Sequence, residues 1–470
     1  MLKKFARLLL IAAAGVVGLV CTLYLAIVLI NLGDGPPDAA AERLVEMRKP
    51  TLPAADNGFY ILAGFGAPDG ADAQALGEQH MAALLKVFAD HPSGNASAEA
   101  YNETAPYSRP VEALPAKLRC SPDKQSCLAL YLKEREAYGT AARDKAFLLK
   151  RYADMRAKPG YEEVLIPDFS APFTSFSTLR GAHEIELALA AQAVADGAAQ
   201  AGLQRLAAIA AHDRLLLTRA QTLVGRMIGV RMVFDSAHLA SELVRRDAAL
   251  AGQHRAVLQG IMAPLEPGVF DMGAVFETEA GMMMRLFAGL DRNLLVQAEM
   301  LTGSRVASTL GMPMYRRNDS MRAYHAIVQA QLAMAKAAPR ELEGQIEKLR
   351  QTQQQAVDQV SMTNLAMLRN PVGKVLLAEG MPEQSGYKLR LVDLDGYLRL
   401  FGLQLALTGN SVAPAERAAW IRQHAPDALS PYDGSPLTYD AAKEELRFIG
   451  KGRNNYLPGD KKTLAIALGS

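Results

Sequence analysis

Apolar residues run from Leu8 to Ile30, broken only by Thr22, and three cationic residues precede the run. At about 1.5 Å per residue, a helix of this length covers the roughly 30 Å hydrocarbon core of a bilayer, whereas the apolar region of a cleavable signal peptide has about 7–15 residues. We therefore predict a transmembrane anchor over residues 8–31 that contacts the lipid bilayer. Because cationic residues resist translocation, residues 1–7 are expected to form a cytoplasmic tail, and the rest of the chain is expected to be periplasmic.

Beyond the anchor, the hydrophobic pattern divides the chain into four parts. Gly and Pro interrupt residues 32–57, which we interpret as a juxtamembrane linker. Helical periodicity then predicts a first helical subdomain over residues 58–160 and a main helical bundle over residues 161–380. Residues 381–470 are expected to form a C-terminal helical module that ends in a β-hairpin. The predicted fold class is mainly α, an irregular bundle, because no repeat of about 34 residues with the tetratricopeptide pattern is found.

Three segments of the first subdomain have distinct patterns. The glycine-rich segment Phe59–Gly66 is too short for a good helix and is typical of an extended or turning segment. Residues 91–115 are rich in Pro, Ser, Asn and Gly, which predicts a surface loop. Apolar positions from Leu128 to Met155 recur at intervals of three, four and seven residues, which predicts one long helix ending near Pro159.

The main bundle is expected to begin with an αα-hairpin. Ser177 can cap a helix that runs to about Gly197, and a turn near residue 200 leads into a second helix. In that second helix, apolar positions from Leu206 recur at three and four and continue towards Arg246. The same periodicity predicts further helices over residues 276–301, 319–337 and 340–369.

The C-terminal module contains the fragment Asp393-Leu-Asp395-Gly before an apolar helix. An Asp-x-Asp-Gly fragment suggests a calcium loop, but the later ligands and the closing Glu are missing, so capping of a helix N-terminus is the preferred role for these aspartates. Turn residues from Pro431 to Tyr439, followed by an alternating segment from Glu445 to Ile449, predict the β-hairpin.

Charge and cysteine content narrow the classes of partner. The net charge is +2 and the basic residues are dispersed, which excludes nucleic acid as a partner. Cys120 and Cys127 bracket a short polar loop, and a pair this close in sequence predicts a disulfide in an oxidising compartment. A zinc site would need further Cys or His nearby and the sequence has none there, so we expect no metal and no cofactor.

Four short motifs carry a resemblance to a known group of proteins. They are Asn57-Gly-Phe-Tyr with Gly64-Phe-Gly-Ala-Pro, Asn370-Pro-Val-Gly-Lys, Asp393-Leu-Asp-Gly-Tyr-Leu-Arg-Leu, and Pro431-Tyr-Asp-Gly-Ser-Pro-Leu-Thr-Tyr. As a set they resemble uncharacterised single-pass inner-membrane proteins of Gram-negative bacteria. The resemblance implies the cell inner membrane and the periplasm as the compartment, and it implies no activity.

Motifs for catalysis are incomplete. His183-Glu184 begins like a zinc-protease helix, but Leu187 occupies the position of the second His. No Gly-x-Ser-x-Gly nucleophile elbow occurs. Glu277 and Glu279 lie two residues apart and therefore point to different sides of a helix, which favours a solvated surface over an acid/base pair.

His183, Glu186 and Asp213 are the best candidates for a site. His183 lies on the apolar stripe of the first hairpin helix, and Glu186 lies beside it one turn on. Asp213 interrupts the ladder of the facing helix, and antiparallel pairing brings it within side-chain reach of His183. Because an unpaired buried carboxylate is costly, we predict a buried polar cluster across the hairpin. A structural role is favoured over a functional one, since a closed bundle core gives a substrate no route.

These patterns predict a non-catalytic scaffold or accessory subunit of a cell-envelope protein assembly, anchored in the membrane and bound to an envelope protein partner. The alternative is an envelope hydrolase that acts on cell-wall or lipid material. A deep polar cleft with convergent Glu, Asp and His would favour the hydrolase, whereas a broad apolar patch would favour the scaffold.

Overall fold

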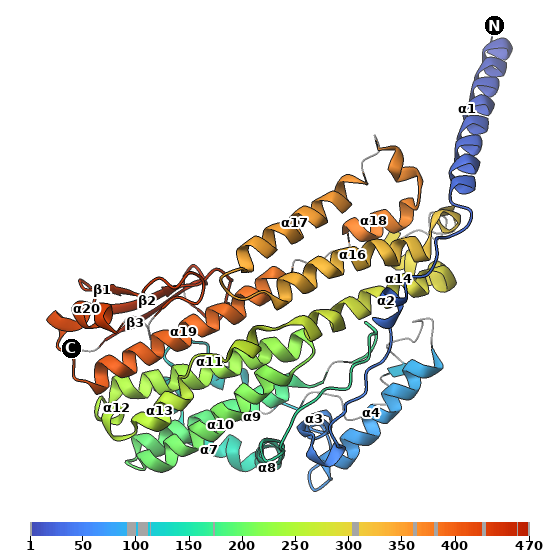
Figure 1. Ribbon diagram of the computed structural model, residues 1–470. Helices are drawn as coiled ribbons and strands as arrows, with labels where there is room; N and C mark the ends of the chain where they lie inside the picture. The colour runs from blue at the N-terminus through green and yellow to red at the C-terminus, as the bar shows by residue number, and fades with distance from the viewer. Residues whose placement is uncertain are drawn as a thin grey trace.

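The computed structural model describes residues 2–91, 100–101, 111–112, 114–172, 174–302, 310–360, 364–379, 384–424, 429–457 and 459–468. This part of the chain is mostly helical, with one small sheet near the C-terminus (Figure 1). Most of the N-terminal helix α1 (Leu2–Ile30) projects beyond the body, and its apolar stretch is long enough to span a membrane. Most of the loop predicted over residues 91–115, and the boundary predicted at residue 380, lie outside the described residues.

The first helical part of the body corrects two predictions. Segment 59–66 is largely helical, not extended, because the Asn57 side chain caps α3 by accepting a hydrogen bond from the Phe59 N–H at 3.0 Å. The long helix predicted from Leu128 is divided into three, with breaks at Glu134 and Lys145. The elements in this part are α2 (Ala39–Arg43), η1 (Ala54–Asp56), α3 (Gly58–Ala63), α4 (Ala73–Asp90), η2 (Ala116–Leu118), α6 (Cys127–Lys133), α7 (Arg135–Asp144) and α8 (Ala146–Arg156).

The predicted αα-hairpin is present as α9 (Phe176–Ala195) and α10 (Ala199–Arg219). The turn between them contains Gly197 with a φ of 87°, a conformation that favours glycine. The second helix does not continue to Arg246 as predicted. It ends at Arg219, and α11 (Leu223–Arg246) follows after a break at which the Glu163 carboxylate accepts hydrogen bonds from the N–H groups of Gln221 and Thr222 at 2.8 and 2.7 Å.

Further helices agree with the predicted periodicity, although the glutamine-rich helix ends at Asp358 and does not reach Arg369. α14 packs on α16, and α17 lies along the outside of the body (Figure 1). The elements are α12 (Ala249–Gln253), α13 (Arg255–Ile261), η3 (Pro267–Phe270), α14 (Gly273–Thr302), η4 (Met312–Met314), α16 (Arg317–Lys336), α17 (Leu342–Asp358), η5 (Leu365–Leu368) and α18 (Pro371–Glu379).

The C-terminal module contains α19 (Ser385–Gly409), α20 (Pro414–Gln423) and a sheet of β1 (Thr438–Asp440), β2 (Glu445–Ile449) and β3 (Thr463–Ala467). The predicted hairpin is confirmed as β1 and β2, with Tyr439 opposite Leu446. The prediction missed β3, which pairs antiparallel with β2 and places Leu464 opposite Phe448. The strand order is β1-β2-β3.

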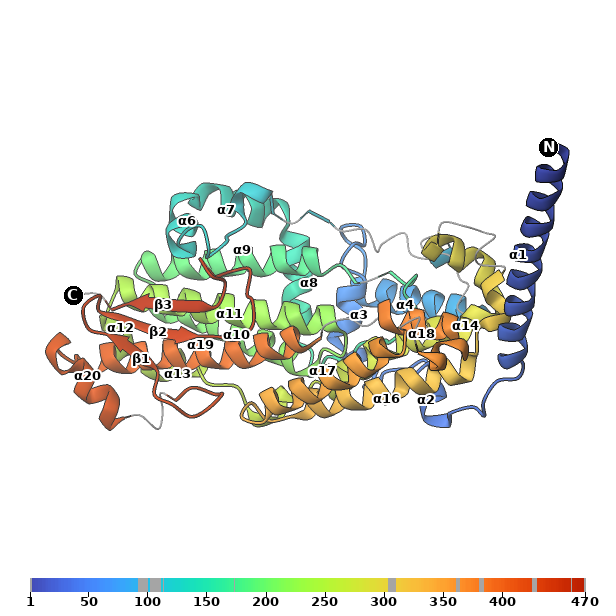
Figure 2. The same ribbon diagram turned by 90° about the horizontal axis from the view of Figure 1, so that it is seen from above.

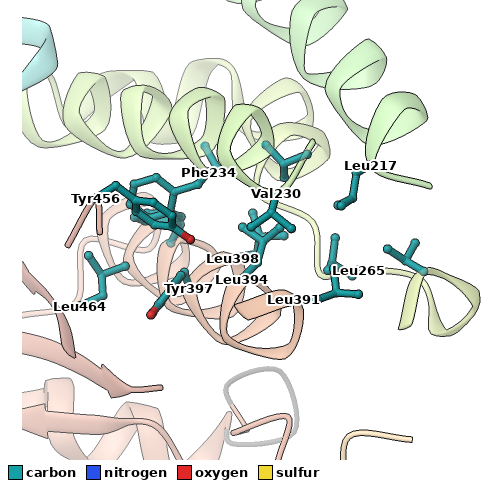
Figure 3. Close-up of a cluster of buried hydrophobic side chains, with 14 of the residues drawn as sticks. Leu217, Val230, Phe234, Leu265, Leu391, Leu394, Tyr397, Leu398, Tyr456 and Leu464 are labelled. Carbon is teal, nitrogen blue, oxygen red and sulfur yellow. The ribbon is translucent and has the colours of Figure 1, made fainter. Parts of the chain in front are cut away.

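A large apolar core joins the main bundle to the C-terminal module. Figure 3 shows side chains of α11 facing side chains of α19, with Tyr456 and Leu464 of the module beside them. The rings of Phe234 and Tyr456 have centroids 4.5 Å apart, and Phe234 also meets Tyr397 edge-on at 5.8 Å. The module is therefore part of the same packed core as the bundle.

The predicted juxtamembrane linker does not stand free of the body. Asn31 accepts a hydrogen bond from the Asn370 N–H at 2.6 Å and donates one to the Leu368 carbonyl at 2.7 Å. Four residues after the end of α1, Asp34 accepts a hydrogen bond from the Asn318 N–H at 2.6 Å. Figure 2 shows that α1 leaves one end of the long body and runs across its long axis.

Candidate functional site

The structure brings together His183 of α9 and Asp213 of α10, as their spacing predicts. The Nε2 atom of His183 lies 3.0 Å from Oδ2 of Asp213. The hydroxyl of Ser236, on α11, donates a second hydrogen bond to the same oxygen at 2.5 Å. All three residues are buried, and Asp213 is 0 % exposed. One carboxylate thus links three helices, and Ser236 is the member that sequence reasoning missed.

Glu186 is paired elsewhere. Arg205 donates to both of its carboxylate oxygens, at 2.8 and 2.9 Å, and Arg156 of α8 lies 3.5 Å away. The prediction that Glu186 joins His183 and Asp213 is therefore wrong. Glu186 lies one turn after His183 and is within reach of Arg156 on α8 and Arg205 on α10. Bidentate pairing with arginine supplies two charge-assisted hydrogen bonds to the carboxylate.

Tyr152 closes the cluster from the side of α8. Its ring meets the rings of His183 and His212 edge-on, with centroids 6.4 and 5.6 Å away. Burial lowers the pKa of His212 to about 4, because a protonated imidazole would lose its hydration there. Among the described residues, the Tyr152 hydroxyl, His212 Nδ1 and Asp213 Oδ1 have no hydrogen-bond partner.

The hydrogen-bond pattern of the cluster differs from that of a Ser-His-Asp triad. In a triad the histidine lies between serine and aspartate and accepts the serine proton. Here Asp213 lies between His183 and Ser236, so the serine hydroxyl points its proton at a carboxylate. This arrangement holds α9, α10 and α11 together, and the base beside the serine is a carboxylate, not the imidazole of a triad.

The predicted disulfide between Cys120 and Cys127 is confirmed, with the two Cα atoms 5.5 Å apart. Buried carboxylates hold both ends of this loop. Glu184 of α9 accepts a hydrogen bond from the Cys120 N–H, and Glu242 of α11 accepts one from the Leu128 N–H at 2.9 Å. Burial raises the pKa of Glu184 to about 7. Sequence reasoning missed both roles, because the partners are more than sixty residues apart.

Asp393 forms a second buried polar centre, and its predicted capping role is wrong. The aspartate lies inside α19, where its carboxylate accepts hydrogen bonds from the Tyr432 hydroxyl at 2.7 Å and from the N–H groups of Lys451 and Gly452 at 2.8 Å. Burial nevertheless raises its pKa to about 6. Its neighbour Asp395 accepts a hydrogen bond from the Leu265 N–H at 2.7 Å. Both aspartates join α19 to distant segments.

The paired glutamates of α14 also separate. Glu277 forms an ion pair with Arg48 at 3.0 Å, in a partly exposed position. Glu279 is more enclosed than the predicted solvated surface. It accepts a hydrogen bond from the Leu223 N–H at 3.2 Å, and burial raises its pKa. The two carboxylates therefore have separate partners.

A cleft of about 900 Å³ opens between α8 and the connection from α3 to α4. Asp69, Asp72 and Asp154 are the acidic residues that line it. Asp72 caps α4 by accepting from the Gln74 N–H at 2.9 Å, and Asp154 pairs with Lys150 at 2.6 Å. Arg151, at its base, is buried and donates to loop carbonyls, including that of Ala67 at 2.7 Å. No histidine is among the described residues that line the cleft.

Comparison of the chain with protein-family models, curated proteins and solved structures finds no match.

Proposed function

We propose that this chain is a membrane-anchored periplasmic scaffold or accessory subunit of a cell-envelope assembly. In this proposal α1 spans the inner membrane with its N-terminus in the cytoplasm, because the cationic residues lie before the apolar run. The helical body then presents its outer surface to an envelope protein partner.

The fixed junction between α1 and the body is the observation that supports this proposal best. An enzyme that acts on dispersed substrates works equally well on a flexible tether, whereas a scaffold must hold its partner at a defined position. Asn31 makes one hydrogen bond to the last residue of η5 and one to Asn370, which precedes α18, and Asp34 binds the start of α16. The body is thereby held at one height and orientation relative to the anchor.

The geometry of the polar clusters favours the scaffold over an envelope hydrolase. In the described residues, Asp213 and Glu186 join helices to one another, and Asp393 joins α19 to Tyr432 and to the loop at Lys451. The cleft beside α8 has the volume of a ligand site, but two of its three acidic side chains, Asp72 and Asp154, are used in a cap and an ion pair.

Crosslinking in intact cells followed by mass spectrometry tests the proposal. The full chain at its native abundance is expected to yield reproducible crosslinks to one envelope protein. The variant Asn31→Ala keeps the apolar anchor but removes the two hydrogen bonds of Asn31 at the junction, so those crosslinks should weaken or move. Thr22→Ala is the matched control, since the Thr22 hydroxyl bonds only within α1, to the Gly18 carbonyl at 2.8 Å.

Two results would contradict the proposal. One is a wild-type chain that yields no crosslinked protein while the purified protein degrades cell-wall or lipid material. The other concerns orientation: alkaline phosphatase fused after Ser470 should be active, and an inactive fusion with a fluorescent cytoplasmic reporter at the same site would reverse the topology.

A further inference from the structure

Exposed apolar side chains gather at the end of the body that meets α1. Leu365 is 82 % exposed, more than any other large apolar side chain that the structure describes. The segments that carry these side chains contact one another: η4, which follows Leu310, and α17 and η5 all contact α18. We call this set the apolar end, and its members are Leu310, Val357, Leu365, Leu368 and Val375.

The body also covers one face of α1 over the last two turns of that helix. Tyr24, Ile27 and Val28 are partly covered and Asn31 is buried, whereas residues 4–23 are exposed. Spacings of three, four and seven place these residues on one face of a helix. The Tyr24 hydroxyl donates a hydrogen bond to the Leu310 carbonyl at 3.2 Å. The body therefore lies beside α1 for about 10 Å, from Tyr24 to Asn31.

This overlap is longer than the part of α1 that can stand outside the lipid. The apolar run from Leu8 to Ile30 is about 35 Å long as a helix, whereas the hydrocarbon core is roughly 30 Å thick. The apolar run is therefore only about 5 Å longer than the hydrocarbon core is thick. Because the body lies beside α1 for about 10 Å, about 5 Å of this overlap lies within the hydrocarbon core. The apolar end must meet lipid at that depth.

We propose that the apolar end inserts into the periplasmic leaflet and is a second membrane contact of the protein, an inference that rests on the anchorage in the proposed function. Phospholipid is the occupant because the apolar end continues the lipid-facing surface of α1. The carbonyls of Leu310 and Leu368 already accept hydrogen bonds from Tyr24 and Asn31, which lowers the cost of placing these two backbone groups in lipid. Arg369, the residue after Leu368, is exposed and pairs with Asp319 at 3.2 Å, so its charge is already partnered within the body.

Fluorescence quenching by brominated phosphatidylcholine tests this contact in the full chain. The one native tryptophan, Trp420, lies on α20 at the opposite end of the body (Figure 1), so the wild-type protein reports the distance from lipid of that end. In a Trp420→Phe background, Leu365→Trp reports on the apolar end and Leu19→Trp on the anchor. Ile449→Trp is the matched control, because Ile449 is 67 % exposed on β2, away from α1.

In liposomes that contain the brominated lipid, Leu365→Trp and Leu19→Trp should both lose emission relative to unbrominated liposomes, while Trp420 and Ile449→Trp keep theirs. Leu368→Trp provides a second reporter in the same helical turn. Quenching of Leu19→Trp without quenching of Leu365→Trp or Leu368→Trp would overturn the inference and leave the anchorage intact. If Leu19→Trp is not quenched either, the anchorage itself is wrong and the inference falls with it.

Discussion

Acid should destabilise this protein through histidines that are buried in their neutral form, and His212 gives the sharpest test. His212 is enclosed by α8 and α10, and its Nδ1 has no partner among the described residues. Burial lowers its pKa from 6.5 to about 4, while the neighbouring charge of Asp213 raises it and the charges of Arg156 and His183 lower it. Burial also lowers the pKa of His80 and of His238.

The lowered pKa fixes the direction and size of the effect. In the unfolded chain His212 takes up a proton below its ordinary pKa, whereas in the folded protein it stays neutral until the pH approaches 4. The contribution of neutral His212 to the free energy of unfolding is therefore fully present above pH 6.5 and is lost as the pH falls towards 4. Linkage gives a loss of about 2 kcal/mol between about pH 7.5 and about pH 5 from this residue.

The substitution His212→Leu removes this titration and keeps an apolar side chain of similar size in the core. Urea unfolding of the full chain in detergent, followed by far-ultraviolet circular dichroism, measures the free energy of unfolding at both pH values. The variant should lose about 2 kcal/mol less than the wild type on acidification. His424→Leu, at the exposed end of α20, controls for the loss of a histidine as such. Equal acid sensitivity in His212→Leu and in the wild type would refute the reasoning.

Three further substitutions test the buried contacts. Asp393→Asn places an amide opposite several hydrogen-bond donors. We expect the free energy of unfolding to fall by about 2–4 kcal/mol and amide exchange in β2 and β3 to become faster. Unchanged exchange in these strands would contradict the role assigned to the carboxylate. Gly77→Ala places a Cβ against the Tyr60 carbonyl and should lower the melting temperature. Gly252 has open space around it, so Gly252→Ala should not lower it. Equal melting temperatures of the two variants would refute the close approach of α3 and α4. Asp213→Ala should cost about 3 kcal/mol in urea unfolding, because it leaves buried groups unpaired, and loss of function with full stability would argue for a functional cluster instead.

The pairing of α9 and α10 could be predicted from local sequence patterns alone. The apolar stripes define the facing surfaces, and the short turn at Gly197 fixes which residues lie opposite one another. His183 and Asp213 therefore meet as their spacing predicts. The same local logic predicted the disulfide loop and the hairpin of β1 and β2.

Contacts between residues distant in sequence explain the predictions that were wrong. The helix from Leu206 ends at Arg219 because Glu163, from a segment before α9, binds the backbone at the break. Asp393 resembles a cap locally, but its hydrogen-bond donors come from a loop almost sixty residues later. Charged residues at such positions look like surface or turn residues until the partner segment is known.

The sideways departure of the body from α1 has a mechanical consequence. Because the junction at Asn31 leaves little freedom to swivel, a rotation of α1 about its own axis turns the whole body with it. The body extends across that axis, so its far end, which carries the C-terminal sheet, moves through a wide arc around α1 (Figure 2). A twist of a few degrees applied to α1 would thus become a large displacement at the distal end.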